Sequence, residues 1–254
     1  MLNDYLGSIN SFTYNGRNSL VFGLMVESKE FVYGSAAPKV ETVYVPGYGT
    51  LILNNKVDEL DNEEHEDIDI KFNCHVLPED TQDLHILARK IYSWLYGDIG
   101  FKKLQDSYEP NYYRMAYVRQ AASVEDVAAA LAGRITITFT ARAYKRATIG
   151  ERVIAITETP GKIYNMEAYT SKPIVYIYAY GDVVLYFNQR QISINDIVGT
   201  ITLDSETLRA YRGDENCNNK LVSQVFPRLV PGMNTISWTG NVTRIEIIPR
   251  WVTL

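Results

Sequence analysis

The residue types that catalyse reactions or bind metals are scattered along this chain of 254 residues. Its three histidines, His65, His75 and His85, lack the spacing of metal ligands. Glutamate follows His65, but no second histidine stands four positions after it, so the helical zinc-protease motif is absent. The chain has no Gly-x-Ser-x-Gly turn for a hydrolase nucleophile, and Gly47-Tyr48-Gly49 is too short for a phosphate-binding loop.

One segment has part of a calcium-binding pattern. Asp214, Asn216 and Asn218 are spaced like the first ligands of a calcium loop. Asn219 stands where that loop needs glycine, and Val225 stands where it needs glutamate. We interpret the segment as a polar turn and predict no metal ion.

The two cysteines do not indicate a reactive thiol or a disulfide. Cys74 and His75 are adjacent, and neighbours on a strand point to opposite faces, so they would not meet as nucleophile and base. Cys217 falls in a different predicted domain from Cys74, and we expect both thiols to be reduced. We therefore predict no catalytic, cofactor-binding or metal-binding residue, and a protein that is not an enzyme.

Composition narrows the class of protein further. Hydrophobic residues make up 46% of the chain and charged residues 22%, as in globular proteins. The net charge of -5 and the lack of a long basic run exclude general attraction to nucleic acid or anionic lipid. The first residues lack a signal-peptide layout and no apolar stretch is long enough for a bilayer, so we expect a soluble protein made in the cytoplasm, without a membrane partner. The 19 tyrosines suit either cross-strand pairs within sheets or subunit interfaces.

Turn and helix signals indicate a β domain with one clear helix in the first part of the chain. Asn15-Gly16 predicts a hairpin over residues 9–22, because both central positions of its turn need positive φ. Residues 80–96 carry apolar side chains at helical spacing and end before Gly97, which predicts a helix. A shorter helix is predicted from Ser123 to Gly133.

Extended segments surround that helix. Alternating apolar and polar residues predict half-buried strands at Ile68–Phe72 and Arg134–Tyr144. Ser35 to Tyr48 is rich in glycine, proline and small residues and predicts a long loop or protruding arm that contacts a partner. A second extended pair is predicted across Asn54-Asn55, with Thr50–Leu53 before it.

Asp58 to Asp69 contains eight acidic residues in twelve positions. One interpretation is a solvated loop that mutual repulsion keeps extended. In a ring of copies, the same charges would form a negative wall that repels a polyanion.

The sequence pattern changes after Tyr144. From Val153 to Leu254, short strand signals alternate with turn markers, without helical periodicity. The strands predicted there include Ile174–Tyr180, Val183–Phe187, Thr200–Leu203, Thr235–Trp238 and Thr243–Ile248, with turns at Gly181-Asp182 and Thr239-Gly240-Asn241. This spacing predicts a β-sandwich of about 100 residues. We place the boundary at 146–152, which gives domains 1–145 and 152–254.

Three groups of residues, in one order along nearly the whole chain, carry a resemblance to a known family. They are Asp69–Cys74 leading to a helix that ends Ser93-Trp94-Leu95; Lys103-Leu104-Gln105 followed by Tyr108–Ala116; and the series Thr202–Glu206, Phe226–Leu229, Pro231–Asn234 and Ile248–Trp251. In this order they resemble the distal tail protein (Dit) family of siphophages that infect Gram-positive bacteria.

The resemblance implies a mainly β fold of two domains: an N-terminal β domain with a helix and an extended arm, and a C-terminal galectin-like β-sandwich. It implies a structural virion protein of the phage tail tip, whose N-terminal domains form a hexameric ring around the DNA channel. As a baseplate hub, that ring would join the tail tube protein to the tail-tip lysin or fibre, and DNA would pass through without specific binding. No catalytic residue or cofactor comes with the family, and the chain is too short for the carbohydrate-binding modules inserted in some members.

An alternative function is a carbohydrate-binding β-sandwich module. Tyr176, Tyr178 and Tyr180 share one face of a predicted strand, where they form either a sugar platform or a subunit contact. The fold class does not decide between these functions, because sandwiches host many of them. An enzyme ranks third, since no acid and base groups are paired.

Overall fold

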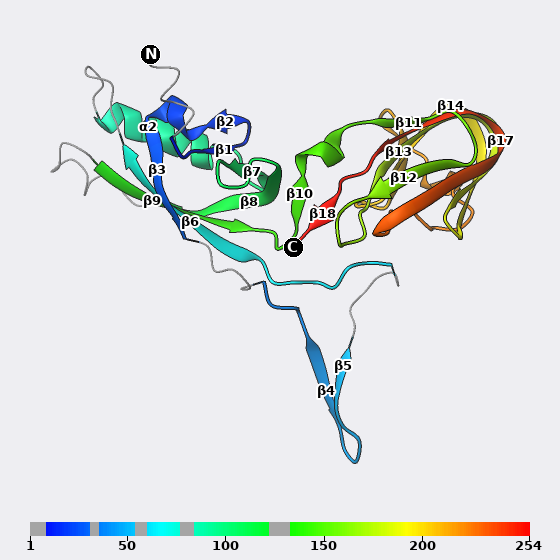
Figure 1. Ribbon diagram of the computed structural model, residues 1–254, viewed down its shortest axis with the longest axis horizontal. Coiled ribbons are helices and arrows are strands. Elements are labelled where there is room, and N and C mark those ends of the chain that lie inside the picture. The colour runs from blue at the N-terminus through cyan, green and yellow to red at the C-terminus, as the bar shows by residue number, and fades with distance from the viewer. Residues whose placement is uncertain (1–8, 31–35, 54–59, 77–83, 122–132) are drawn as a thin grey trace. The chain divides into compact units, whose positions relative to one another are not determined.

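The computed structural model describes residues 9–30, 36–53, 60–76, 84–121 and 133–254 (Figure 1). The chain divides into two compact units. Residues 1–53 and 64–145 belong to the first unit, and residues 54–63 and 146–254 belong to the second. The fold is mainly β, as the sequence predicted.

The first unit is built on one antiparallel sheet with the strand order β2-β1-β7-β8-β9-β6-β3. Its strands are β1 (Phe12–Tyr14), β2 (Arg17–Asn18), β3 (Leu24–Glu30), β6 (Ile68–Val76), β7 (Lys102–Asp106), β8 (Tyr112–Ala121) and β9 (Gly133–Ala141). The predicted first hairpin is confirmed at its turn, because β1 pairs with β2 across Asn15-Gly16, and both turn residues have positive φ. Its second arm is shorter than predicted, since residues 19–22 form a 3-10 helix. The predicted strand at 68–72 is confirmed within β6, and the strand predicted at 134–144 is confirmed as β9, which ends three residues earlier, at Ala141.

Helix α2 (Leu84–Tyr96) covers one face of this sheet (Figure 1). Its apolar side chains Leu87, Ile91, Trp94 and Leu95 are buried in a core with Phe12, Phe72 and Phe139. The Trp94 ring stacks on Phe22 of the short 3-10 helix η1 (Ser19–Phe22), with centroids 4.3 Å apart. The predicted C-terminal end of the helix is confirmed, while residues 80–83 and most of the shorter helix predicted from Ser123 lie outside the described residues.

Residues 41–53 form a hairpin of their own, from β4 (Glu41–Val45) and β5 (Gly49–Leu53). The sequence predicted a long loop or protruding arm over Ser35–Tyr48, and the structure forms this segment as an exposed hairpin whose strands were not predicted. Thr50–Leu53 was predicted to pair across Asn54-Asn55, but it pairs back with β4, and residues 54–59 lie outside the described residues. Pro46-Gly47 supplies the turn, and positive φ at Gly47 and Gly49 allows Leu53 to pair back with Glu41.

The second unit is an antiparallel sheet with the order β11-β17-β13-β14-β15-β16, and β12 also pairs with β17. The strands are β11 (Ile154–Ile156), β12 (Gly161–Asn165), β13 (Ile174–Phe187), β14 (Arg190–Asp204), β15 (Arg209–Arg212), β16 (Glu215–Asn216) and β17 (Gly232–Ile248). Inward side chains of the long central strands, such as Ile177, Leu185 and Ile245, are fully buried.

Three long strands replace the short ones that the sequence predicted. The pairing register shifts at Gly181/Val183, and a second irregularity lies near Gly240. Gly181 and Gly240 have positive φ, and a Cβ on Gly240 would lie 2.5 Å from the Asp182 carbonyl oxygen. These glycines therefore mark β-bulges inside continuous strands, where the sequence suggested turns between separate ones.

The segment at the proposed boundary is hydrogen-bonded to the C-terminal residues of the chain. The Ala147 backbone N–H donates to the Trp251 carbonyl oxygen at 3.0 Å, and the Arg250 N–H donates to the Gly150 carbonyl oxygen at 2.8 Å. The remaining short elements are β10 (Lys145–Ala147), η3 (Thr148–Glu151), η4 (Asn218–Lys220) and β18 (Val252–Thr253). The second unit thus starts about six residues before the predicted domain and also takes in residues 54–63.

Candidate assembly surfaces

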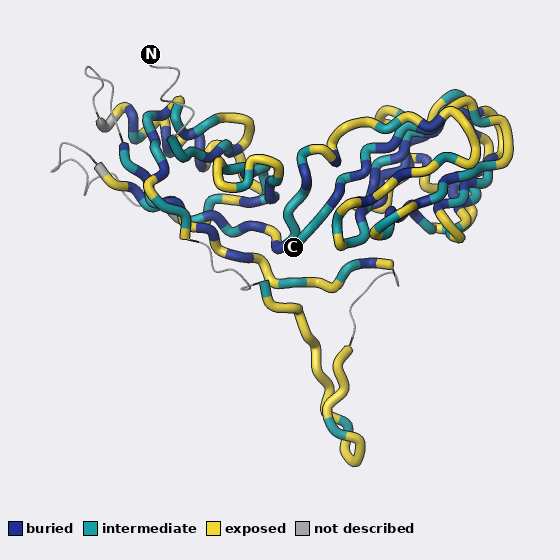
Figure 2. The backbone as a smooth tube through the Cα atoms, viewed as in Figure 1, coloured by how far each residue is buried: buried dark blue, intermediate teal, exposed yellow. Residues whose placement is uncertain are grey.

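The β4–β5 hairpin exposes apolar side chains that a folded chain usually buries. Tyr44, Tyr48 and Ile52 are 71%, 77% and 71% exposed, and Figure 2 shows nearly the whole hairpin as exposed. In the described part of the chain, β4 and β5 pair only with each other. An isolated two-stranded hairpin is marginally stable in water, so this surface is suited to burial against another protein chain.

The first part of the acidic run is buried. Asp61 is 7% exposed, and its Oδ1 accepts a hydrogen bond from Arg228 Nε at 3.0 Å. Lys172 Nζ lies 3.1 Å from the same oxygen. Next to it, the Asn62 side chain donates to the Thr170 carbonyl oxygen at 2.8 Å and accepts from the Thr170 N–H at 2.9 Å. These contacts join residues 61 and 62 to the second unit.

The middle of the run, residues 64–66, has a fixed backbone. The Lys39 N–H donates to the Glu64 carbonyl oxygen at 2.8 Å, and the Glu66 N–H donates to the Ala37 carbonyl oxygen at 2.9 Å. His65 Nδ1 lies 3.2 Å from the Tyr144 hydroxyl, while the side chains of Glu64 and Glu66 are exposed. This segment therefore presents two carboxylates to solvent from a held extended backbone.

The end of the run lies on the sheet of the first unit. Asp69 pairs with Arg119 and accepts a hydrogen bond from the Thr140 hydroxyl at 2.9 Å. Burial of Asp61 and pairing of Asp69 show that the described part of the run, residues 60–69, is not one solvated loop. The acidic side chains therefore lie in different environments: Asp61 is buried and Asp69 is paired, because each has a basic partner far away in the sequence, while Glu64 and Glu66 are exposed.

The row of tyrosines on β13 is largely occupied by its own neighbours. The Arg244 guanidinium lies 3.9 Å from the centroid of the Tyr178 ring. Tyr178 Oη donates to Glu246 Oε2 at 3.0 Å, and Arg244 Nε donates to Glu246 Oε1 at 2.9 Å. Tyr176 is half-buried, and Tyr180 is exposed. A sugar platform needs open ring faces, so the covered Tyr178 does not favour the carbohydrate-binding alternative.

Both cysteines considered for catalysis lie away from solvent. Cys74 is buried, and burial raises the pKa of its thiol to about 12, so it is protonated at neutral pH. Cys217 is also buried, and both thiols are free. His75 Nε2 lies 3.2 Å from a Glu27 carboxylate oxygen on the neighbouring strand, while the His85 side chain lies outside what the structure describes.

The segment 214–218, whose residues are spaced like calcium ligands, forms local hydrogen bonds. The Asn218 N–H donates to the Asn216 side-chain oxygen at 3.0 Å, and the Asn218 side-chain oxygen accepts from the Ala210 N–H. Asp214 is exposed beside Gly213. Over the described ranges, no group of three or more His, Cys, Asp or Glu side chains is arranged to hold a metal ion.

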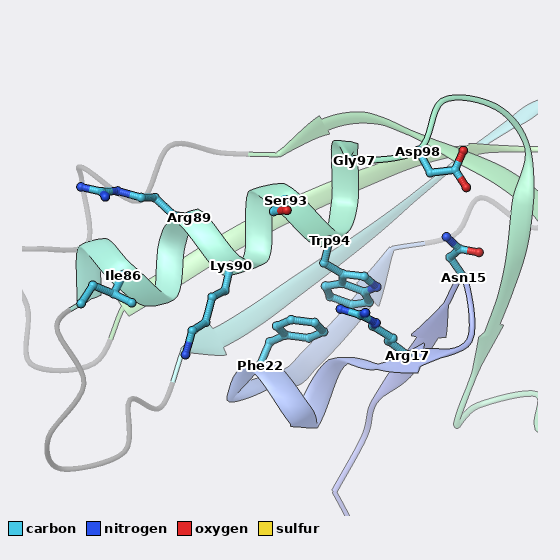
Figure 3. A pocket seen from close by; sticks show the side chains of 10 residues that line it. All are labelled: Asn15, Arg17, Phe22, Ile86, Arg89, Lys90, Ser93, Trp94, Gly97 and Asp98. Atoms are coloured by element: carbon cyan, nitrogen blue, oxygen red, sulfur yellow. The ribbon is translucent and has the colours of Figure 1, made fainter.

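A groove of about 790 Å³ lies between α2, η1 and the Asn15-Gly16 turn, and sequence reasoning did not identify it. Figure 3 shows the rings of Phe22 and Trp94 between the side chains of Lys90 and Arg17. Because Arg17 and Lys90 are far apart in the sequence, no local pattern pointed to the groove.

Comparison with known proteins finds a matching family model and solved structures with a similar fold. Residues 56–141 match the family model of the phage tail protein RIFT-related domain. The crystal structure of SPP1 Dit, described as a paradigm of the hub adsorption apparatus in phages that infect Gram-positive bacteria, is similar over 97% of this chain and 100% of its own. The TM-score is 0.72 at 13% identity. The chain has the fold of a siphophage distal tail protein.

Two further solved structures are similar to this chain. Structures of the phage p2 baseplate in its activated conformation, with Sr and with Ca, are similar with TM-scores of 0.50 and 0.53 at 9% identity. They cover 94% of this chain and 98% and 97% of their own chains. No curated protein sequence matches the chain significantly. The resemblance inferred from the sequence is thus confirmed at the level of the fold.

In the described part of the chain, no helix has the length and apolar character needed to span a membrane.

Proposed function

We propose that this protein is a structural component of a phage tail tip, without enzymatic activity, located in the virion. Six copies form a ring that joins the tail tube protein to the tail-tip lysin or fibre, and the DNA channel runs through the ring. The observation that carries this proposal is the similarity of fold to SPP1 Dit over essentially both whole chains.

The exposed hairpin supports assembly with other copies. Apolar side chains on β4 and β5 are exposed in the single chain, and a neighbouring subunit would bury them. The acidic balance of the chain fits a channel that DNA crosses, since a basic lining would hold the duplex.

The experiment is to replace Tyr44 and Ile52 by serine and to measure the mass of the protein in solution across a concentration series. We expect a folded protein with an unchanged melting temperature that no longer forms rings. Tyr164→Ser with Met166→Ser is a matched control, because both side chains are exposed on the second unit. Rings formed equally well by the hairpin variant and the control would contradict the role of the hairpin.

A further inference from the structure

We propose that the groove beside α2 binds residues 64–66 of a second copy of this chain. The proposal rests on the proposed ring and names the surfaces through which neighbouring copies meet. Its basis is a mismatch of charge on each surface: the groove has cations without carboxylate partners, and the segment has carboxylates held toward solvent.

The groove lacks carboxylates to balance its cations. Arg17 and Lys90 are exposed, and neither forms an ion pair with any residue that the structure describes. The carboxylate that lines the groove, Asp98, is already taken, because its Oδ2 lies 2.5 Å from Lys102 Nζ. Between the two cations, the Phe22 and Trp94 rings form an apolar floor (Figure 3). An extended segment with two carboxylates on one side of its backbone, one for each cation, matches this arrangement in charge.

The segment 64–66 has that form. Glu64 and Glu66 lie two residues apart on an extended backbone, so their side chains leave it on the same side. The bridge between Pro38 and His65, flanked by two backbone hydrogen bonds, holds this backbone in place. In the part described, the Glu66 carboxylate forms no ion pair, and the Glu64 carboxylate forms one, with Lys39 Nζ at 3.9 Å. Little ordering is needed for binding, which lowers its entropic cost.

A second copy, and not the same chain, must supply the segment. Both surfaces belong to the first unit, where residues 64–66 lie well away from α2 and β2 (Figure 1). Two different complementary surfaces on one unit give a head-to-tail contact, and such contacts close into rings when the rotation between copies permits. A volume of about 790 Å³ is within the usual range for binding pockets and can hold a short extended segment.

The test uses reversal of charge in the full chain. Arg17→Glu with Lys90→Glu makes the groove negative, and Glu64→Lys with Glu66→Lys makes the segment positive. Each double variant should weaken self-association by roughly tenfold or more, because attraction becomes repulsion at both positions. Lys162→Glu with Arg209→Glu lowers the net charge as much as the groove variant does, at exposed positions of the second unit, and it should assemble like the wild type.

Mixing the two double variants gives the decisive measurement. In the mixture, the negative groove of the groove variant can bind the positive segment of the segment variant. The unchanged positive groove of the segment variant can bind the unchanged negative segment of the groove variant. Alternating rings should therefore form from two proteins that fail separately, and the variant with all four changes should also assemble. Circular dichroism of each variant checks that the fold is kept.

The outcomes separate this inference from the proposed function. A wild-type chain that stays monomeric at every concentration would overturn the ring and the inference together. If the wild type assembles and the groove variant assembles equally well, the inference alone is overturned. Failure of the mixture to assemble, with both variants folded, would also overturn it.

Discussion

Replacing Asp61 by asparagine should destabilise the second unit strongly. The Asp61 carboxylate accepts from Arg228 Nε at 3.0 Å, and Arg228 is only 3% exposed. Its Nη1 donates to the Pro227 and Ser205 carbonyl oxygens at 3.2 and 3.3 Å, so backbone dipoles hold the guanidinium but do not neutralise it. Among the described residues, Asp61 is the carboxylate within ion-pair distance of Arg228.

The size of the effect follows from this burial. Removing one partner of a buried ion pair leaves an uncompensated charge and costs about 3–5 kcal/mol. Asparagine keeps a hydrogen-bond acceptor, so we expect the lower end of that range, about 3 kcal/mol. For a unit of this size, such a loss lowers the melting temperature by roughly 10 °C.

Differential scanning calorimetry of the full chain can follow this unit, because two compact units can give separate transitions. Asp214→Asn is the matched control: the side chain is exposed and forms no ion pair in the described structure, so the change should be within about 0.5 kcal/mol. Arg228→Met in the Asp61→Asn background should recover much of the loss, because it removes the unpaired charge. An Asp61→Asn protein that melts like the control would refute the buried-pair argument, as would strictly additive effects of the two changes.

Three further predictions concern acid stability, the thiols and the core. Burial opposes ionisation of Asp204, but the hydrogen bonds and positive charge of Arg250 outweigh this effect and lower the pKa of Asp204 below 3.8. The Asp204 carboxylate therefore contributes fully to stability above pH 3.8, and this contribution is lost as the pH falls through the folded pKa. Asp204→Asn should flatten the fall in melting temperature below about pH 4. A maleimide should leave Cys74 unmodified in the native protein at pH 8 and react with it in urea, since burial raises its pKa to about 12; rapid native labelling would disprove the burial. Trp94→Phe removes the hydrogen bond from Nε1 to the Tyr14 carbonyl oxygen at 3.0 Å and should cost about 1–3 kcal/mol in urea unfolding, and an unchanged midpoint would contradict this.

The sequence alone determined the elements whose signals are local. Asn15-Gly16 specified the first hairpin, because positive φ at both turn positions depends only on those residues. Alternation specified β6, in which buried and exposed side chains follow each other from Ile68. The end of α2 at Tyr96, before Gly97, also followed from neighbouring residues.

The tertiary structure decided which segments meet. Gly181 and Gly240 have the same local preference for positive φ in a turn or a bulge, and only pairing with adjacent strands made them bulges. Asp61 read as one member of a solvated acidic run, yet its partner Arg228 lies 167 residues away and draws it into the second unit. The groove cations Arg17 and Lys90 likewise come together only through packing of α2 on the sheet. Local propensity acts over a few residues, whereas ion pairs, grooves and pairing registers depend on contacts between distant parts of the chain.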